Sequence, residues 1–411
     1  MVYLKCAGCG FEKIVSFLTL GDIPPVNAFI LPAEIAQEVK YPLNLAYCPQ
    51  CFLVQLEEIV PPETLFRQYL HLSAGSQQNI SHLKEVAAHL AKKHAISGEK
   101  RVLEIGSNDG TLLSFFKQYT LNILGVDPAK NLISLNKEKG VPYIPEFFNT
   151  STASQIVKER GKFDFIIGLN VIPHTPDNID LLKGARILMN DKCLLIMEGV
   201  YALETILRGE FDTIYHEHVY TFSLHSLIAL FRMAGMKVID VERIATQGGS
   251  LRICAMKEEY ASEVSSRVLS LLEEEKKIGF DKPETYLLVE KKVAEFKIHL
   301  RNLINEEKKR GGKLIGLGAP ARGVVILNYC QIGKEDIAFI VDDTSLKQGR
   351  VTPGVHIPVQ SFESIGSNTE KRTFLLLSWN YKEDYLRRLK EKYASFRMIV
   401  PFPKLEVIEH G

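Results

Sequence analysis

Residues 102–116 read VLEIGSNDGTLLSFF, and this segment indicates how the central part of the chain folds. A short apolar run reaches Gly106, a polar turn follows, and an apolar helical pattern begins after Gly110. Glycine at these points allows a tight turn and the close approach of a ligand to the backbone. A strand, a glycine turn and a helix in this order predict the opening of a Rossmann-like βαβ unit.

Strand and helix patterns alternate from this stretch onward. NILGVD, FDFIIGLNVI and CLLIMEGVY have strand patterns, and DLLKGARILM has a helical one, which predicts a mostly parallel sheet. VIDVERI and GGSLRICAM predict an antiparallel hairpin at its edge. The pattern restarts at GLGAPARG, residues 316–323, so a second α/β unit is expected over about 286–411. The apolar spacing of 284–310 predicts a helix that packs the domains together.

Composition restricts the class of protein. The 411 residues are 46% hydrophobic and 24% charged, as in ordinary globular proteins. Fifty basic and 49 acidic residues give a net charge of +1, which argues against binding to nucleic acid. No apolar run reaches the roughly 18–20 residues that span a bilayer, and the N-terminus lacks the pattern of a signal peptide. We therefore expect a cytoplasmic protein without membrane contact. We also expect a monomer.

Four of the seven cysteines form two CxxC pairs separated by 38 residues. Two such turns supply four thiolates to one metal site, and this ligand set selects zinc in a structural role or, less often, an iron–sulfur cluster. A short segment with few core residues needs such a staple. Free or redox-active cysteines are the alternative. The predicted ligands are Cys6, Cys9, Cys48 and Cys51.

These patterns predict the fold class and the division of the chain. The fold is α/β, with two Rossmann-like doubly wound domains preceded by a small zinc-binding domain. We expect the zinc-binding domain at 1–66 and the cofactor-binding domain at 67–260. A helical connector with the C-terminal Rossmann-like domain is expected at 261–411.

The first glycine turn favours S-adenosylmethionine (SAM) over a dinucleotide. Its pattern, E-x-G-x-x-x-G, lacks the GxGxxG turn that holds a pyrophosphate, and SAM has no pyrophosphate. An acidic residue suits the cationic groups of SAM, and a carboxylate 21 residues past the first glycine suits ribose hydroxyls. NAD and a plain structural turn remain as alternatives. The expected cofactor-binding residues are Glu104, Gly106, Asn108, Asp109, Gly110 and Asp127.

Residues 215–220 read YHEHVY and concentrate groups capable of acid–base chemistry. The HExxH pattern of zinc proteases is absent, because position 220 is tyrosine. A histidine beside Glu217 can be oriented by it, and Tyr215 can donate to an oxyanion. His174 follows an earlier strand of the same sheet, so both stretches can reach one cleft. A metal bound by His216 and His218, or a solvated loop, are the alternatives.

Two arginines are candidates for a phosphate. Arg322 lies in the second glycine turn and Arg252 in GGSLR, and a guanidinium matches phosphate geometry. Surface arginines in ordinary α/β turns are the alternative. A dinucleotide could also bind here, since Asp342 and Asp343 follow Gly318 at a suitable distance, although Pro320 interrupts the motif.

Taken together, these motifs resemble nucleotide-sugar C-3 methyltransferases that make branched deoxysugars. The resemblance spans essentially the whole chain. It rests on CAGCG, IGSNDG, NVIPH, Y-x-EH followed by FS, GGSLR, and GAPARG with LNYC, VDD and KQGR. It implies a zinc domain, a SAM domain and a C-terminal Rossmann-like domain, with the nucleotide sugar between the last two.

The resemblance also implies roles for individual residues. His218 would be the base, Glu217 its orienting partner and Tyr215 a donor to the oxyanion. His174 and Tyr69, from YLHLSAGS, would complete the active site.

The predicted function is SAM-dependent C-methylation of a nucleotide-linked 4-keto-6-deoxy sugar at C-3. A sugar carbon beside a ketone becomes a nucleophile when a base removes its proton. The nucleotide, whether dTDP, GDP or CDP, is left open. Two alternatives come from other classes: a non-catalytic scaffold that binds SAM or nucleotides, and an NAD-dependent nucleotide-sugar oxidoreductase.

Overall fold

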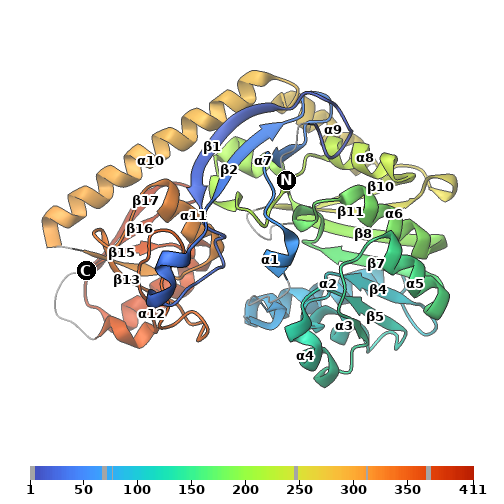
Figure 1. Cartoon of the computed structure of the whole chain (residues 1–411), viewed down its shortest axis with the longest axis horizontal. Coiled ribbons are helices and arrows are strands. Elements are labelled where there is room, and N and C mark those ends of the chain that lie inside the picture. The colour runs from blue at the N-terminus through green and yellow to red at the C-terminus, as the bar shows by residue number, and fades with distance from the viewer. Residues whose placement is uncertain (1–4, 67–71, 76, 245–248, 312, 367–371) are drawn as a thin grey trace.

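The computed structural model describes residues 5–66, 72–75, 77–244, 249–311, 313–366 and 372–411. Three sheets organise these residues. A four-stranded N-terminal sheet lies between a seven-stranded central sheet and a six-stranded C-terminal sheet, which occupy opposite sides of the molecule (Figure 1). The predicted α/β fold with two doubly wound units is confirmed.

The central sheet begins at the quoted stretch. Its strands β4 and β5 are buried along their whole length, as expected for parallel strands covered on both faces. The predicted hairpin β10–β11 is antiparallel and pairs with β8 through β11. In spatial order the strands are β10 (Met236–Ile244), β11 (Ser250–Lys257), β8 (Met189–Val200), β7 (Phe163–Leu169), β4 (Val102–Ile105), β5 (Ile123–Val126) and β6 (Tyr143–Ile144).

Helices on both faces cover this sheet (Figure 1). Three of them begin at side-chain caps predictable from sequence: Asn149, Asp177 and Ser223 each accept a backbone N–H of the first turn. The helices are α2 (Gln77–Lys93), α3 (Thr111–Phe116), α4 (Ile133–Glu138), α5 (Thr150–Arg160), α6 (Asn178–Leu188), α8 (Leu224–Met233) and α9 (Ser266–Ile278). Helix α7 (Ala202–Arg208) follows β8 and contacts helix α10 (Pro283–Gly311).

The C-terminal sheet repeats the doubly wound arrangement. Its strands are parallel except the last, which is antiparallel at the edge. In spatial order they are β14 (Val359–Gln360), β13 (Ile337–Val341), β12 (Leu314–Leu317), β15 (Arg372–Leu376), β16 (Phe396–Val400) and β17 (Glu406–His410). Helices α11 (Ala321–Tyr329) and α12 (Lys382–Lys392) belong to this unit.

The N-terminal sheet contains more regular structure than its loop-rich sequence suggested. The strands β1 (Val15–Ile23), β2 (Tyr41–Tyr47) and β3 (Val54–Leu56) are antiparallel, and helix α1 (Pro62–Phe66) follows them. The fourth strand, β9 (Tyr220–Thr221), comes from the central part of the chain and pairs with β3. Pairing across this distance in sequence leaves no local signal, so the sequence did not indicate that residues from beyond the boundary expected at 66 join this sheet.

Helix α10 (Pro283–Gly311) matches the helix predicted at 284–310 and runs along the outside of the molecule (Figure 1). It contacts β1, α7, β12 and β15, so it touches all three parts of the chain. Tyr286 stacks on Tyr47 with ring centroids 3.7 Å apart. Phe296 stacks on Phe402 at 4.8 Å. These contacts belong to an apolar core that is continuous between the three sheets. Among the described residues, no helix is both long and apolar enough to cross a membrane.

Candidate active site

The first glycine turn follows β4 and has the backbone geometry that its sequence predicts. Gly106 and Gly110 have φ values of 69° and 74°. A Cβ at Gly106 would lie 2.5 Å from a methyl carbon of Val171, and one at Gly110 would lie 2.4 Å from Oδ1 of Asn136. Only glycine fits both the left-handed backbone and the available space.

Polar atoms without partners surround this turn. Oε2 of Glu104, Oγ of Ser107 and Oδ1 of Asn170 are buried and have no hydrogen-bond partner among the described residues. Burial, with the nearby charges of Asp127 and Asp109, raises the pKa of Glu104 well above its ordinary value. Unpaired buried polar atoms cost free energy, so their concentration here fits a polar, positively charged ligand such as SAM.

Asp127 closes the turn from the end of β5. Its Oδ2 accepts the backbone N–H of Asn108 at 3.0 Å, and its Oδ1 accepts that of Ala129 at 2.9 Å. Burial raises the pKa of Asp127 despite these bonds. The carboxylate therefore holds the turn in place, and its role toward a ribose stays a prediction.

Asn108 and Asp109 hold a second segment over the turn. Oδ1 of Asn108 accepts the backbone N–H of Ser73 at 2.9 Å, and Oδ2 of Asp109 accepts that of Ala74 at 3.0 Å. Asp109 also accepts from the hydroxyl of Thr111 at 2.6 Å. The two side chains thus organise the rim of the candidate cofactor site, and direct cofactor binding by them stays a prediction.

His218 lies at the centre of the second group of candidate residues. Its Nδ1 is 2.7 Å from the carbonyl oxygen of Thr213, and its Nε2 is 2.8 Å from the hydroxyl of Tyr215. A carbonyl only accepts, so Nδ1 carries the proton and Nε2 accepts the Tyr215 hydroxyl. Burial and the neighbouring His174 hold the pKa of His218 well below its ordinary value. The ring is therefore neutral at neutral pH, and its Nε2 is unprotonated.

His174 joins this group from the 3-10 helix η4 (Ile172–His174), which follows β7. Its Nδ1 donates to the carbonyl oxygen of Glu217 at 2.8 Å, and its ring centroid is 4.8 Å from that of His218. The structure thus brings together Tyr215, Glu217, His218 and His174, as the sequence predicted. Tyr69 lies outside the described residues.

The contacts of Glu217 differ from those expected. Its Oε1 accepts the side-chain amide of Asn27 at 2.6 Å. Both ring nitrogens of His218 are occupied by Thr213 and Tyr215, so a backbone carbonyl makes the orienting contact that the sequence assigned to Glu217. Burial and the charge of Glu217 raise the pKa of Tyr215, which keeps the phenol protonated. Neither Thr213 nor Asn27 was predicted, because a main-chain carbonyl and an amide far away in sequence carry no motif.

His216 points away from this group. Its Nε2 is 3.2 Å from the carbonyl oxygen of Tyr41 on β2, and burial lowers its pKa. Residues 215–218 form a turn, in which the backbone N–H of His218 donates to the carbonyl oxygen of Tyr215 at 2.8 Å. This turn places His218, and not His216, beside Tyr215 and His174.

Arg252 is buried within the central sheet. Its Nε and Nη2 donate to Oε2 of Glu198 at 3.0 and 2.8 Å, directly across from it on β8. Phosphate binding by Arg252 stays a prediction, and it would require this ion pair to open.

Arg322 joins the C-terminal sheet to the rest of the molecule. Its guanidinium binds both carboxylate oxygens of Asp212 at 3.0 and 2.9 Å and Oε2 of Glu210 at 3.3 Å. The ring of Trp379 lies 4.3 Å from the guanidinium carbon, and its Nε1 donates to Asp212 at 2.8 Å. Burial opposes the charge of Arg322, but Asp212 and Glu210 outweigh it and raise the pKa. Phosphate binding by Arg322 also stays a prediction.

The four predicted zinc ligands converge. Their sulfur atoms all lie within 4.8 Å of one another, with Cys6 and Cys51 at 3.5 Å and Cys9 and Cys48 at 3.6 Å. A zinc–sulfur distance of about 2.3 Å implies tetrahedral sulfur atoms about 3.8 Å apart. The cluster therefore fits the proposed ion, with no position left for a substrate.

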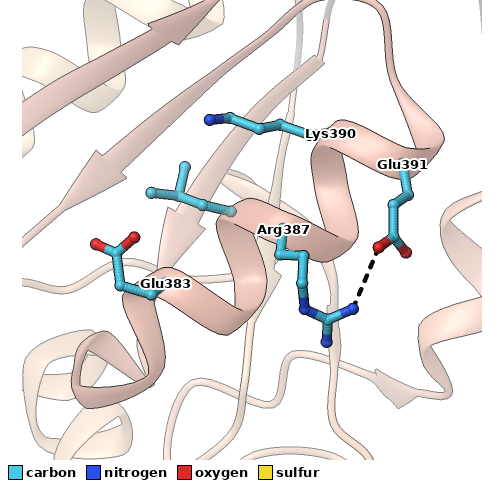
Figure 2. Close-up of a pocket in the computed structure, with 5 residues that line it drawn as sticks. Glu383, Arg387, Lys390 and Glu391 are labelled. Atoms are coloured by element: carbon cyan, nitrogen blue, oxygen red, sulfur yellow. Dashed lines mark hydrogen bonds and ion pairs between the residues drawn. The ribbon is translucent and has the colours of Figure 1, made fainter.

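A hollow on the outer side of α12 is unrelated to these groups. It is lined by Leu386 and four charged side chains of the helix, with an ion pair between Arg387 and Glu391 (Figure 2). None of the predicted site residues lines it.

Family models cover most of the chain. Residues 6–66 match a "Putative zinc binding domain", residues 77–241 a "Methyltransferase domain", and residues 245–403 a "C-methyltransferase C-terminal domain". The chain is 30% identical to C-methyltransferase NovU of Streptomyces niveus over 406 residues, which are 98% of this chain and 96% of that protein.

Solved structures resemble part of the chain. Magnesium protoporphyrin IX methyltransferase (ChlM) of Synechocystis PCC 6803 with bound SAM is 15% identical, covers 43% of this chain and 79% of its own, and has a TM-score of 0.33. The PH0226 protein of Pyrococcus horikoshii OT3 is 15% identical, covers 47% and 97%, and has a TM-score of 0.36.

Proposed function

The chain belongs to the SAM-dependent C-methyltransferase family, and from this premise we propose that its substrate is a nucleotide-linked 4-keto-6-deoxy sugar. The methyl group would be added at C-3 by way of an enolate. The chain would act as a monomer, with zinc stabilising its N-terminal domain.

One observation carries this proposal. The basic nitrogen of His218 and the hydroxyl of Tyr215 are neighbours, 2.8 Å apart. In a ketone, the acidic C–H and the carbonyl oxygen are on adjacent carbons, so removal of the proton requires a base and a donor side by side. A neutral imidazole and a protonated phenol are those two groups.

The proposed reaction begins when the ketosugar enters and the Tyr215 hydroxyl turns from His218 to the oxygen on C-4. This movement frees Nε2, which takes the proton from C-3, and the electron pair of the broken C–H bond moves toward the C-4 oxygen. His174 and Tyr69 are proposed as further groups around that oxygen. When bound, SAM supplies a methyl group that C-3 can attack, so the new C–C bond replaces the S–CH3 bond. The proton on His218 then leaves to solvent.

Thr213 has a defined part in this scheme. Its carbonyl fixes the proton on Nδ1 of His218 and stabilises the imidazolium that forms when Nε2 takes up a proton. This contact suits a base that must be charged only during the reaction.

The contacts of two arginines limit where the nucleotide could bind. Arg252 and Arg322 were predicted as phosphate ligands, and each is engaged by carboxylates. Binding of a diphosphate by either side chain would have to displace Glu198 or Asp212. We therefore propose only that the nucleotide extends from C-1 of the sugar toward the boundary with the C-terminal sheet.

The test uses the full chain with labelled SAM and a panel of dTDP-, GDP- and CDP-linked 4-keto-6-deoxy sugars. We expect methyl transfer to one of them and loss of deuterium from C-3 to solvent. His218→Ala should lower both rates roughly 10²–10⁴-fold, with Tyr215→Phe as the matched variant that retains the base. If deuterium at C-3 exchanges in His218→Ala as fast as in the wild type, His218 is not the base.

Two further outcomes would support the alternatives. SAM binding without transfer to any ketosugar would favour a scaffold. Hydride transfer from a nicotinamide cofactor would favour the oxidoreductase.

A further inference from the structure

The segment that contains Tyr215, Glu217 and His218 continues directly into the N-terminal sheet. Residues 220 and 221 form β9, in which Tyr220 pairs with Gln55 and Thr221 with Val54 on β3. The backbone N–H of Leu56 donates to the carbonyl oxygen of Val219 at 2.9 Å. The candidate catalytic segment is therefore anchored, at its C-terminal end, to the zinc-binding domain.

The zinc ligands connect to the same strand. The second cysteine pair immediately precedes β3, and the backbone N–H of Cys48 donates to the carbonyl oxygen of Leu53 at 2.9 Å. The buried side chain of Gln55 reaches the first pair, because its Oε1 accepts the backbone N–H of Ala7 at 3.0 Å. Both cysteine turns are thus hydrogen-bonded to β3 or to the residue before it, and β3 pairs with the strand that follows the catalytic segment.

A side chain of the zinc-binding domain also contacts this segment directly. Asn27 lies between the two cysteine pairs, in a turn where the N–H of Ala28 donates to Pro25 at 3.0 Å. Its Nδ2 donates to Oε1 of Glu217 at 2.6 Å, although 190 residues separate the two in sequence. Glu217 is only 3% exposed and Asn27 is half-buried, so this bond is partly shielded from water, and a hydrogen bond to a charged group is stronger than one between neutral groups.

We propose that Asn27 is a positioning residue for the methyl-transfer reaction, and that the zinc-binding domain completes the active site through it. By fixing the side chain of Glu217, Asn27 fixes the backbone carbonyl that holds Nδ1 of His174 and the adjacent residue, His218. This inference rests on the proposed function in so far as Glu217 and His218 belong to the catalytic group.

A neutral amide suits this position for a chemical reason. It donates a hydrogen bond to the carboxylate of Glu217 without neutralising it. Aspartate at 27 would place a second carboxylate against Glu217, and the two would repel unless one were protonated. Glutamine would keep the donor but extend it by one carbon.

The experiment compares four variants of the full chain: Asn27→Ala, Asn27→Asp, Asn27→Gln and the control Glu38→Gln. Glu38 also lies in the N-terminal domain and binds another part of the chain, but its partners are His356 and the backbone of Gly354 in the C-terminal domain. Zinc content and SAM affinity are measured first, and both should match those of the wild type in every variant, which shows that each is folded.

The first readout needs no substrate. Backbone amide exchange in residues 215–221 should be faster in Asn27→Ala than in the wild type, and unchanged in Glu38→Gln, which should instead affect residues 354–357. Equal exchange in 215–221 for Asn27→Ala and the wild type would overturn the positioning role.

The second readout is methyl transfer to the ketosugar. Asn27→Ala should lower kcat roughly 10- to 100-fold with little change in KM, and Asn27→Gln should recover part of the loss. Asn27→Asp should be the least active above neutral pH and regain activity as the pH falls. Wild-type kcat and pH profile in Asn27→Asp would overturn the inference. If the wild type methylates no ketosugar while amide exchange responds as expected, the proposed function fails and the positioning role of Asn27 stands.

Discussion

The two glycine turns of this chain have nearly the same backbone and different surroundings. Each follows the first strand of a doubly wound sheet and begins with a glycine in the left-handed region, at φ 69° for Gly106 and 79° for Gly318. Each is closed by an aspartate at the end of the next strand, because Asp127 and Asp342 accept a backbone N–H of their turn at 3.0 and 2.7 Å.

The difference lies in the polar groups around each turn. At the first turn, Oε2 of Glu104 and Oγ of Ser107 are buried without a partner among the described residues. At the second turn, Arg322 is held by Asp212 and Trp379. A side chain crowds the first glycine of both turns, since a Cβ would lie 2.5 Å from Val171 at Gly106 and 1.9 Å from Oγ of Ser378 at Gly318, so this space does not distinguish them.

This comparison shows why a glycine turn alone does not establish a ligand site. The backbone pattern makes the close approach of another group possible in both sheets. In the central sheet, polar atoms remain for a cofactor. In the C-terminal sheet, Arg322 of the turn contacts Asp212 and Glu210 of the central part of the chain, so we expect the second turn to serve domain docking.

The largest expected effect tests the docking role. Arg322→Met should lower the free energy of unfolding by about 3–5 kcal/mol, because Asp212 and Glu210 would be left as buried charges without their partner. SAM affinity should not change. Thermal and denaturant unfolding measure the free energy of unfolding, and calorimetric titration measures the SAM affinity.

Arg388→Met is the matched control, since Arg388 pairs with the exposed Asp343 in the same domain. It should cost less than about 1 kcal/mol. If Arg322→Met instead keeps its stability and raises KM for the nucleotide sugar, the second turn binds phosphate and the contrast between the turns is wrong.

A smaller effect is expected at the first turn. Glu104→Gln should weaken SAM binding roughly 10- to 100-fold, because a bond to a charged group contributes about 1.5–3 kcal/mol. The ligand-free protein should become more stable, since the raised pKa of Glu104 means that its ionised form is costly in the folded state at neutral pH.

Isothermal titration and thermal denaturation check these two opposite changes. Glu383→Gln, in the hollow on α12, is the control, and it should change neither the SAM affinity nor the stability of the ligand-free protein. If Glu104→Gln binds SAM as tightly as the wild type, the buried carboxylate at the first turn does not bind the cofactor.

The smallest effect concerns pH. The pKa of His218 is lowered in the folded protein, whereas the unfolded chain has the ordinary value of about 6.5. As the pH falls below 6.5, the unfolded chain takes up a proton that the folded protein refuses, so the free energy of unfolding falls by up to about 1.4 kcal/mol per pH unit. Arg322 stays charged throughout, because its pKa is raised.

Two measurements over pH 5–8 test this expectation. The plot of kcat/KM should be flat down to about pH 6.5, and His218→Gln should show a shallower loss of stability in acid than the wild type. An acid limb of kcat/KM at or above pH 6.5 would contradict a buried, neutral base at residue 218.

Local sequence was sufficient for the features that depend on neighbouring residues. The predicted α/β fold and the SAM and zinc cofactors are confirmed. The glycine turn after β4, the hairpin β10–β11 and helix α10 appear where their patterns predicted them. The two CxxC pairs indicated one metal cluster because their spacing is itself a ligand pattern.

Local sequence was enough to predict which groups are present and on which strands and turns they lie, because hydrophobic periodicity, glycine geometry and ligand spacing act over a few residues. The tertiary structure alone decided their partners: Thr213 for His218, Asn27 for Glu217, Asp212 for Arg322 and β3 for β9. A charged or polar side chain can be satisfied by any of many groups. Packing selects one of them only when segments that are far apart in the chain are brought together.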